Sequence, residues 1–239
     1  MNVTLERVRA RENEVAVLAY EARRPRGVSL VVGHGYSSSK HNLDFMCGFL
    51  AGHGFGVWSL DFPGHKLGAS GGVLRGVDDC IDAMSAVVEH VRANHPGPIL
   101  TVGHSMGAMT ALFTAAADPQ VTGAIAIATG YGRPSAIAAL KNVGATDFRS
   151  GYVDGVALPE LVEGLDARYE EALPKLAGRP LLIVAAKHDA MVSRASVEEL
   201  YARAPEPKTF ETIESDHTYA GDNARGALLQ WLNERFPRA

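Results

Sequence analysis

The chain has little of what characterises disulfide-stabilised, nucleic-acid-binding or membrane-spanning proteins. Its 239 residues include only two cysteines, Cys47 and Cys80, which lie among apolar neighbours and are expected to be buried free thiols. The net charge is -4 and no block of lysine and arginine is present, so we expect no nucleic-acid partner. No apolar run is long enough to cross a bilayer, so we expect no transmembrane segment.

Targeting signals and cofactor motifs are also missing. The amino terminus lacks the basic start and apolar run of a secretory signal, so we expect a soluble, cytoplasmic protein. The nine histidines include no His-Glu-x-x-His motif, and the chain has no Cys-x-x-Cys pair, so no metal is implied. No glycine-rich phosphate loop is found either. We therefore expect no cofactor.

What is present is an alternation of short apolar runs and helix-like segments. After an opening antiparallel pair, apolar runs typical of strands buried on both faces alternate with amphipathic stretches. The expected strands are 3–8, 14–20, 28–33, 56–60, 98–103, 121–128, 181–186 and 208–213, and the expected helices are 42–53, 76–94, 106–117, 193–204 and 220–236. This order predicts an α/β fold, with a mostly parallel sheet covered by helices on both faces. With 46% hydrophobic residues, the whole chain, 1–239, is expected to form one domain.

The stretch 130–178 interrupts this alternation. It has scattered apolar residues between glycines and charges, and no clear strand. An insertion after the strand ending near Ala128 would lie over the carboxyl edge of the sheet, where ligands bind in such folds. We interpret the stretch as a lid, and an ordinary pair of packing helices is the alternative.

Ser105 has the sequence context of a nucleophile. It lies in the pattern Gly103-His-Ser-Met-Gly107, between an apolar strand and a helix, and the two glycines allow a turn sharp enough to expose the hydroxyl. A second match to Gly-x-Ser-x-Gly surrounds Ser70, but no strand precedes it, so Ser70 is interpreted as a loop serine. For Ser105 the alternative is a serine that only caps the helix.

A nucleophilic serine needs a base and a group that orients the base. His217 follows an expected strand and precedes the last helix, and a surface loop histidine is the alternative. The turn should direct His104, next to the serine, away from the hydroxyl. Asp189, directly after a strongly apolar strand, is the preferred orienting acid, and Asp216 is expected to bond local main-chain amides. Glu214 and Asp222 are the remaining candidate acids.

An oxyanion hole, the pair of donors that stabilises charge on the attacked carbonyl oxygen, is expected from two main-chain N–H groups. The N–H of Met106 follows the nucleophile. The N–H of Tyr36 lies in the loop after the strand 28–33, where Gly35 allows close approach to a substrate. The alternative for this loop is a polar turn without function.

Together these segments resemble the α/β-hydrolase superfamily, and most of all its small bacterial esterases and lipase-like hydrolases. The resemblance rests on His34-Gly35, on Asp61-Phe-Pro-Gly-His65 with Ser70, on the nucleophile elbow around Ser105, and on the late acid and histidine. It implies that Ser105, Asp189 and His217 are the catalytic triad, that Tyr36 and Met106 supply the oxyanion amides, and that His34, Gly35 and Asp61 organise loops.

The chain departs from the pattern of these relatives in two places. Lys66 stands where they often have glycine, and we expect its ammonium group to be solvated, with contact to a substrate carboxylate as the alternative. The oxyanion loop also lacks the run of three glycines found in one lipase–esterase branch.

The expected function is that of a serine hydrolase. It would cleave small-molecule carboxylic esters or thioesters of small to medium acyl groups through an acyl-enzyme. Acyl transfer, carbon–carbon bond hydrolysis and perhydrolysis remain open, because the same triad serves each of them. A ligand-binding protein that has lost catalysis is a further alternative.

Overall fold

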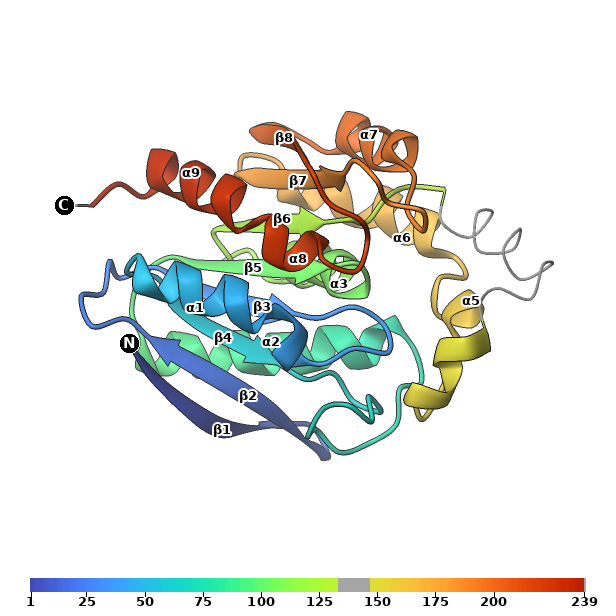
Figure 1. Cartoon of the computed structure of the whole chain (residues 1–239), viewed down its shortest axis with the longest axis horizontal. Helices are drawn as coiled ribbons and strands as arrows, with labels where there is room; N and C mark the ends of the chain where they lie inside the picture. The colour runs from blue at the N-terminus through green and yellow to red at the C-terminus, as the bar shows by residue number, and fades with distance from the viewer. Residues whose placement is uncertain (133–146, 239) are drawn as a thin grey trace.

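The fold is built on a single eight-stranded sheet with the strand order β1-β2-β4-β3-β5-β6-β7-β8 (Figure 1). The computed structural model describes residues 1–132 and 147–238. The strands are β1 (Asn2–Ala10), β2 (Asn13–Glu21), β3 (Ser29–Gly33), β4 (Gly56–Leu60), β5 (Ile99–His104), β6 (Gly123–Ile127), β7 (Leu181–Ala186) and β8 (Lys208–Ile213).

Strand direction changes at one edge of the sheet. β1 pairs with β2 in antiparallel register from Asn2–Glu21 to Ala10–Asn13, and β2 pairs antiparallel with β4. All pairs from β4 to β8 are parallel. The predicted opening pair at the sheet edge is confirmed, as is the α/β-hydrolase fold class. The central strands β3, β5, β6 and β7 are buried along their whole length, which is why they are almost entirely apolar.

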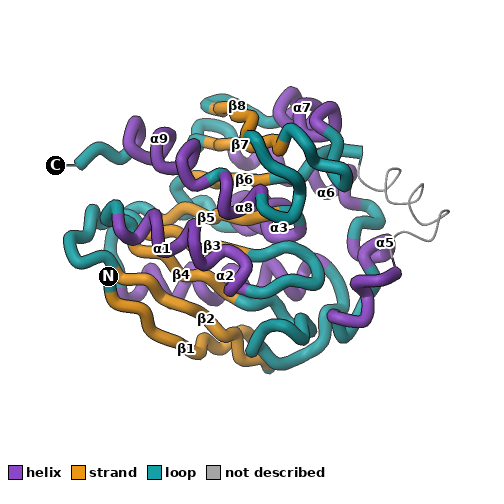
Figure 2. The backbone as a smooth tube through the Cα atoms, in the orientation of Figure 1, coloured by secondary structure: helices purple, strands orange, loops and turns teal. Residues whose placement is uncertain are grey.

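Helices cover both faces of this sheet (Figures 1 and 2). The α-helices are α1 (Asp44–Gly52), α2 (Val77–Asn94), α3 (Met106–Ala117), α5 (Leu158–Leu161), α6 (Leu165–Ala172), α7 (Arg194–Arg203), α8 (Ala220–Asn223) and α9 (Arg225–Arg235), and the short 3-10 helices are η1 (Lys40–Leu43), η2 (Asp147–Tyr152) and η3 (Leu173–Leu176). One apolar core lies between the sheet and α1, α8 and α9, and the other lies between the sheet and α2, α3, α6 and α7. Cys47 on α1 and Cys80 on α2 are buried free thiols, as expected.

The prediction of one continuous helix over 220–236 is wrong. The chain forms α8 and α9, which are separated at Ala224. The Arg225 side chain donates to the carbonyl of Asp222 at 2.8 Å, a carbonyl that a continuous helix would use in its own ladder. The Asp222 carboxylate is in turn bound by the main-chain N–H of Met46 at 2.9 Å, which ties α8 to α1.

The predicted lid, 130–178, lies only partly in the described part of the chain, because 133–146 fall outside it. Of the remainder, η2 and α5 lie beyond one end of the strands (Figure 1). α6 and η3 insert Leu165, Tyr169, Leu173 and Leu176 into the apolar core. Within 1–132 and 147–238, no helix combines the length and the apolar character that crossing a bilayer requires.

Candidate active site

Ser105 lies in a strained turn between β5 and α3. Its backbone angles are φ 55° and ψ -113°, an arrangement that costs a non-glycine residue about 1–3 kcal/mol and that recurs at functional sites. The turn packs tightly, because a Cβ on Gly103 would lie 2.0 Å from the carbonyl oxygen of Gly107, and one on Gly107 would lie 2.1 Å from that of Gly33. Ser105 itself is only partly buried. The side chain is therefore raised above the sheet edge, next to the N-terminus of α3.

Three side chains predicted from distant parts of the sequence meet at this edge. The Nε2 atom of His217 lies 3.0 Å from the Ser105 hydroxyl, and its Nδ1 lies 2.7 Å from Oδ2 of Asp189. Asp189 follows β7 and His217 follows β8, so adjacent parallel strands deliver both groups to the same edge. Two consecutive hydrogen bonds therefore link the Asp189 carboxylate, through the His217 ring, to the Ser105 hydroxyl.

The Asp189 side chain is buried and is held in its ionised form. Its side chain is 1% exposed, and Oδ1 accepts the main-chain N–H groups of Met191 at 2.8 Å and Val192 at 2.7 Å. Burial alone would raise the pKa of this carboxyl. The His217 hydrogen bond and charge, together with the two N–H donors, nevertheless lower the pKa below its ordinary value. The carboxylate is thus fixed in place and ready to stabilise a positive imidazole.

The neighbouring acid and histidine have other roles. Asp216 accepts the main-chain N–H of Tyr219 at 3.0 Å, a local amide bond of the kind expected. The Nε2 of His104 lies 2.8 Å from the carbonyl oxygen of His217 and donates to it, and the two rings are 4.9 Å apart. His104 therefore supports the main chain of His217.

The loop after β3 lies directly against the nucleophile. A Cβ on Gly35 would lie 3.4 Å from the Cβ of Ser105, so the main chain of this loop packs against the Ser105 side chain. The phenol of Tyr36 donates to the carbonyl of Val156 at 3.1 Å. Arg149 donates to both the hydroxyl and the carbonyl of Ser37, at 2.7 and 2.8 Å. Arg149 and Val156, both in the stretch 147–156, thus bind the loop after β3 through hydrogen bonds.

A pocket opens beside Ser105. Its lining is apolar except for the serine and Thr129, whose hydroxyl lies 3.2 Å from the phenol oxygen of Tyr169. The remaining lining residues are Met106 and Met109 from α3, Ala128 after β6, and Leu158, Val162 and Leu165 from the stretch that includes α5 and α6. An acyl chain would meet hydrocarbon here.

The other residues named from the resemblance lie next to this edge. His34 and Asp61 are fully buried, and the main-chain N–H of Phe62 donates to Nε2 of His34 at 3.0 Å. Lys66 is about half exposed, and its ammonium group lies 3.0 Å from a carboxylate oxygen of Asp154 and donates to the carbonyl of Gly151. The Lys66 charge is therefore both paired with Asp154 and exposed to solvent.

Sequence reasoning did not find Lys40 or Arg149. Lys40 is 1% exposed and its ammonium group lies 2.6 Å from Asp61. Each is a single cationic residue in a polar stretch of sequence, and no local pattern separates it from a solvated lysine or arginine. Only the contacts that they make in the folded chain, with Asp61 and Ser37, identify them.

Two buried histidines of the site, His34 and His104, predict a loss of stability in acid. Burial, the largest effect, lowers the pKa of His34 and of His104 to about 3, with the nearby His65 and His217 acting in the same direction. Unfolded histidines take up protons near pH 6.5, so between pH 6.5 and 3 the unfolded state binds more protons than the folded state. The free energy of unfolding should fall by about 3 kcal/mol for each pH unit below 6.

Urea unfolding at pH 7.5, 6 and 5 measures this effect. His104→Gln removes one of the two groups and should show about half the slope. Equal stability at pH 7.5 and 5 would contradict the prediction.

The described ranges 1–132 and 147–238 contain no group of three or more histidine, cysteine, aspartate or glutamate side chains that could hold a metal ion.

Comparisons with known proteins agree with the fold. A profile described as serine aminopeptidase, S33, matches residues 23–147, just over half of the chain. No curated protein matches the sequence.

Many solved structures share the fold at low sequence identity. The Pyrococcus furiosus esterase Pf2001 has a TM-score of 0.74 and 19% identity, covering 98% of this chain and 93% of its own. Est1E from Butyrivibrio proteoclasticus with ferulic acid bound has a TM-score of 0.76 and 17% identity, covering 96% and 98%. XC6422 from Xanthomonas campestris, described as a serine hydrolase without a lid, has a TM-score of 0.71 and 18% identity, covering 100% and 97%.

Proposed function

The chain belongs to the serine aminopeptidase, S33 family of α/β-hydrolases, and we propose that it cleaves carboxylic esters or thioesters with Ser105 as nucleophile, His217 as base and Asp189 as orienting acid. The observation that carries the proposal is the chain of hydrogen bonds at 3.0 and 2.7 Å from the Ser105 hydroxyl through His217 to Asp189. A serine hydroxyl is a weak nucleophile, and this arrangement is what activates one.

The proposed reaction passes through an acyl-enzyme. Nε2 of His217 takes the proton of Ser105 as Oγ attacks the ester carbonyl, and then gives that proton to the leaving alcohol or thiol. Water enters, His217 removes its proton, and the acid is released as Ser105 regains its hydrogen. Asp189 accepts from Nδ1 throughout, so Nε2 is free to receive the proton and the imidazolium is stabilised by the carboxylate.

Stabilisation of the oxyanion is assigned to the N–H groups of Tyr36 and Met106. The closeness of Gly35 to Ser105 and the position of Met106 at the first turn of α3 support this assignment. Removing one such donor typically costs about 3 kcal/mol of transition-state stabilisation.

The pocket favours an uncharged acyl group. The family description names an aminopeptidase, whose substrate carries a free ammonium group, but the lining of the described pocket holds no carboxylate to bind one. The Butyrivibrio relative binds ferulic acid, a carboxylic acid, which is the product class of ester cleavage. Turnover of p-nitrophenyl butyrate against alanine p-nitroanilide tests this choice. Faster cleavage of the anilide would overturn it.

Product analysis with an added alcohol separates hydrolysis from acyl transfer. The free acid is the expected product. Formation of the new ester as the main product would replace the hydrolase assignment with a transferase.

We propose further that the chain is one domain and that 130–178 acts as a cap over the acyl pocket. Support comes from Leu158, Val162 and Leu165, which line the pocket beside Ser105. The part 133–146 lies outside the described residues.

Acyl-chain preference should follow the side chains of this cap. Val162→Ala removes two methyl groups from the pocket wall, so the preferred acyl chain should lengthen and kcat/KM for octanoate relative to butyrate should rise roughly 10-fold. A series of p-nitrophenyl esters from acetate to decanoate measures it. Leu161→Ala is the matched control, because Leu161 is buried nearby but does not line the pocket. An unchanged profile for Val162→Ala would place the acyl chain elsewhere.

A further inference from the structure

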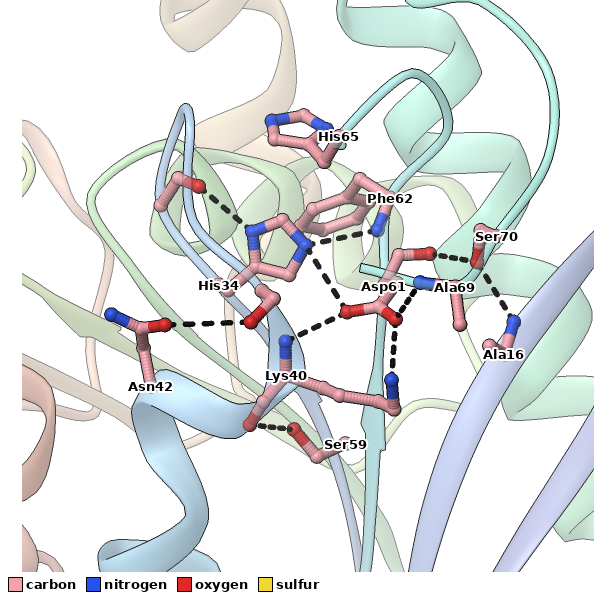
Figure 3. Close-up of polar contacts among 12 residues, drawn as sticks. Ala16, His34, Lys40, Asn42, Ser59, Asp61, Phe62, His65, Ala69 and Ser70 are labelled. Carbon is pink, nitrogen blue, oxygen red and sulfur yellow. Dashed lines mark hydrogen bonds and ion pairs between the residues drawn. The ribbon is translucent and has the colours of Figure 1, made fainter. Parts of the chain in front are cut away.

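A buried ion pair and a buried histidine fasten the loop after β3 to the end of β4 (Figure 3). The ammonium group of Lys40 lies 2.6 Å from Oδ2 of Asp61, with side chains 2% and 0% exposed. The same carboxylate accepts the main-chain N–H of Lys40 at 2.8 Å and that of Ala69 at 2.7 Å. The Asp61 carboxylate therefore connects Lys40, in the segment after β3, with Ala69, in the loop after β4.

Such a pair is poorly explained as a source of stability. Removing two charges from water costs about as much as their attraction returns, so a buried ion pair adds little net stability, although losing one partner is strongly destabilising. What the pair does provide is a defined geometry, because moving the two side chains apart would leave each buried charge without its partner. The loop from His34 to Lys40 is thereby fixed at its far end.

His34 fixes the near end of the loop in a single protonation state. The N–H of Phe62 donates to Nε2 of His34, so that nitrogen must carry a lone pair and the ring hydrogen must lie on Nδ1. Nδ1 then donates to the carbonyl oxygen of Gly35 at 2.8 Å. Nε2 is 3.9 Å from Oδ1 of Asp61, too far for a competing hydrogen bond. The ring is fully buried, and burial lowers its pKa, so it stays neutral.

The hydrogen bond from Nδ1 of His34 to the Gly35 carbonyl also sets the direction of the Tyr36 N–H. The carbonyl of Gly35 and the N–H of Tyr36 belong to the same planar trans peptide and point in opposite directions. Holding the carbonyl on Nδ1 of His34 therefore aims the Tyr36 N–H away from the ring. Because the neighbouring Gly35 is in contact distance of Ser105, the aim of this peptide decides what a substrate oxygen meets there.

We propose that His34 and Lys40 are positioning residues that fix the direction of the Tyr36 N–H. The inference rests on the proposed function, which assigns that N–H as an oxyanion donor. Neither side chain touches substrate. His34 acts through the Gly35 carbonyl, and Lys40 acts through Asp61 by closing the loop that holds the peptide.

Two substitutions of His34 separate its donor from its acceptor. Asparagine places an amide nitrogen near the Nδ1 position and can keep the bond to Gly35 while losing the acceptor for Phe62. Glutamine reaches the Nε2 position and keeps the acceptor while losing the donor. His34→Gln should lower kcat about 100-fold with KM changed less than about threefold, and His34→Asn should lose less than about tenfold.

Affinity for a short-chain trifluoromethyl ketone tests the oxyanion directly, because Ser105 adds to it to form a charged hemiketal. Binding should weaken in His34→Gln in parallel with kcat, and much less in His34→Asn. Equal losses in the two variants, following only their thermal stability, would overturn the proposal.

The ion pair is tested by one single and one double variant. Lys40→Met leaves a buried carboxylate without its cation and should unfold at a lower temperature. Lys40→Met/Asp61→Asn removes both charges and should recover much of that stability while kcat stays at least about tenfold below wild type. Wild-type kcat in the double variant would show that the pair does not position the loop.

A readout independent of catalysis separates failure of this inference from failure of the proposed function. With ¹⁵N-tyrosine labelling, NMR relaxation gives the order parameter of the Tyr36 N–H in the protein without substrate. It should fall in His34→Gln and in the double variant, and stay near the wild-type value in His34→Asn. An unchanged order parameter in all variants contradicts the positioning role even if the chain is an esterase, whereas absence of esterase activity in the wild type contradicts only the proposed function.

Discussion

Replacing Ser105 with alanine is expected to lower ester turnover by about 10⁶-fold, to the level left by binding and the oxyanion donors alone. The attack requires the hydroxyl that His217 contacts at 3.0 Å, and alanine has none. The fold should be retained, because the substitution removes one atom from a partly exposed side chain and leaves the turn glycines untouched. Turnover of p-nitrophenyl butyrate, together with circular dichroism and thermal unfolding, measures both parts.

Ser70 supplies the control for that experiment, since it occupies the second Gly-x-Ser-x-Gly match. Its hydroxyl donates to the carbonyl of Asp61 at 2.7 Å and accepts the main-chain N–H of Ala16 at 2.8 Å. It thus ties its own loop to β2 and to the residue that follows β4. Ser70→Ala should remain reactive toward a fluorophosphonate, whereas Ser105→Ala should not. Retained turnover in Ser105→Ala would remove it as the nucleophile.

The second large effect is expected from Asp189→Asn, which should lower kcat about 10⁴-fold. The asparagine amide can donate to Nδ1 of His217, and that bond would stabilise the tautomer with its hydrogen on Nε2. A hydrogen on Nε2 faces the Ser105 hydroxyl, where the base must instead present a lone pair. The imidazolium would also lose its carboxylate partner. Steady-state kinetics from pH 6 to 9 measures the loss.

Asp216→Asn is the matched control, because Asp216 adjoins His217 in sequence yet accepts only a local N–H, that of Tyr219, in the contacts described above. Its kcat should stay within about threefold of wild type. A comparable loss in the two variants would mean that the acid has been assigned to the wrong residue, and a small loss in Asp189→Asn would leave His217 without an essential orienting group.

The sequence predicted well those features that are encoded locally. β4, β7 and β8 have the expected bounds, and α3 begins and ends where expected, because a short apolar run between turn residues has few alternatives. α7 also lies within one residue of the expected range 193–204 at each end, and its N-cap is a local feature, in which the Ser193 hydroxyl accepts the Ser196 N–H. Ser105 was recognisable because a strand, a sharp turn and the start of a helix follow one another within the few residues around it.

The features that the sequence did not predict depend on contacts between distant residues. Lys40 and Asp61 are 21 residues apart, and although the resemblance implied that Asp61 organises a loop, nothing in the sequence identified Lys40 as its partner. The break between α8 and α9 depends on one arginine side chain bonding a carbonyl, which periodicity does not register. The pocket wall combines α3 with residues near 160, so its lining emerges only when the chain is folded.

Covalent labelling of the wild-type protein with a fluorophosphonate, followed by mass mapping of the modified peptide, tests the central claim most directly. It asks at once whether a serine is activated and which one. The account predicts a single phosphonylated residue, Ser105, and loss of labelling in the His217→Ala variant. Absence of labelling, or modification of another serine such as Ser70, would contradict it.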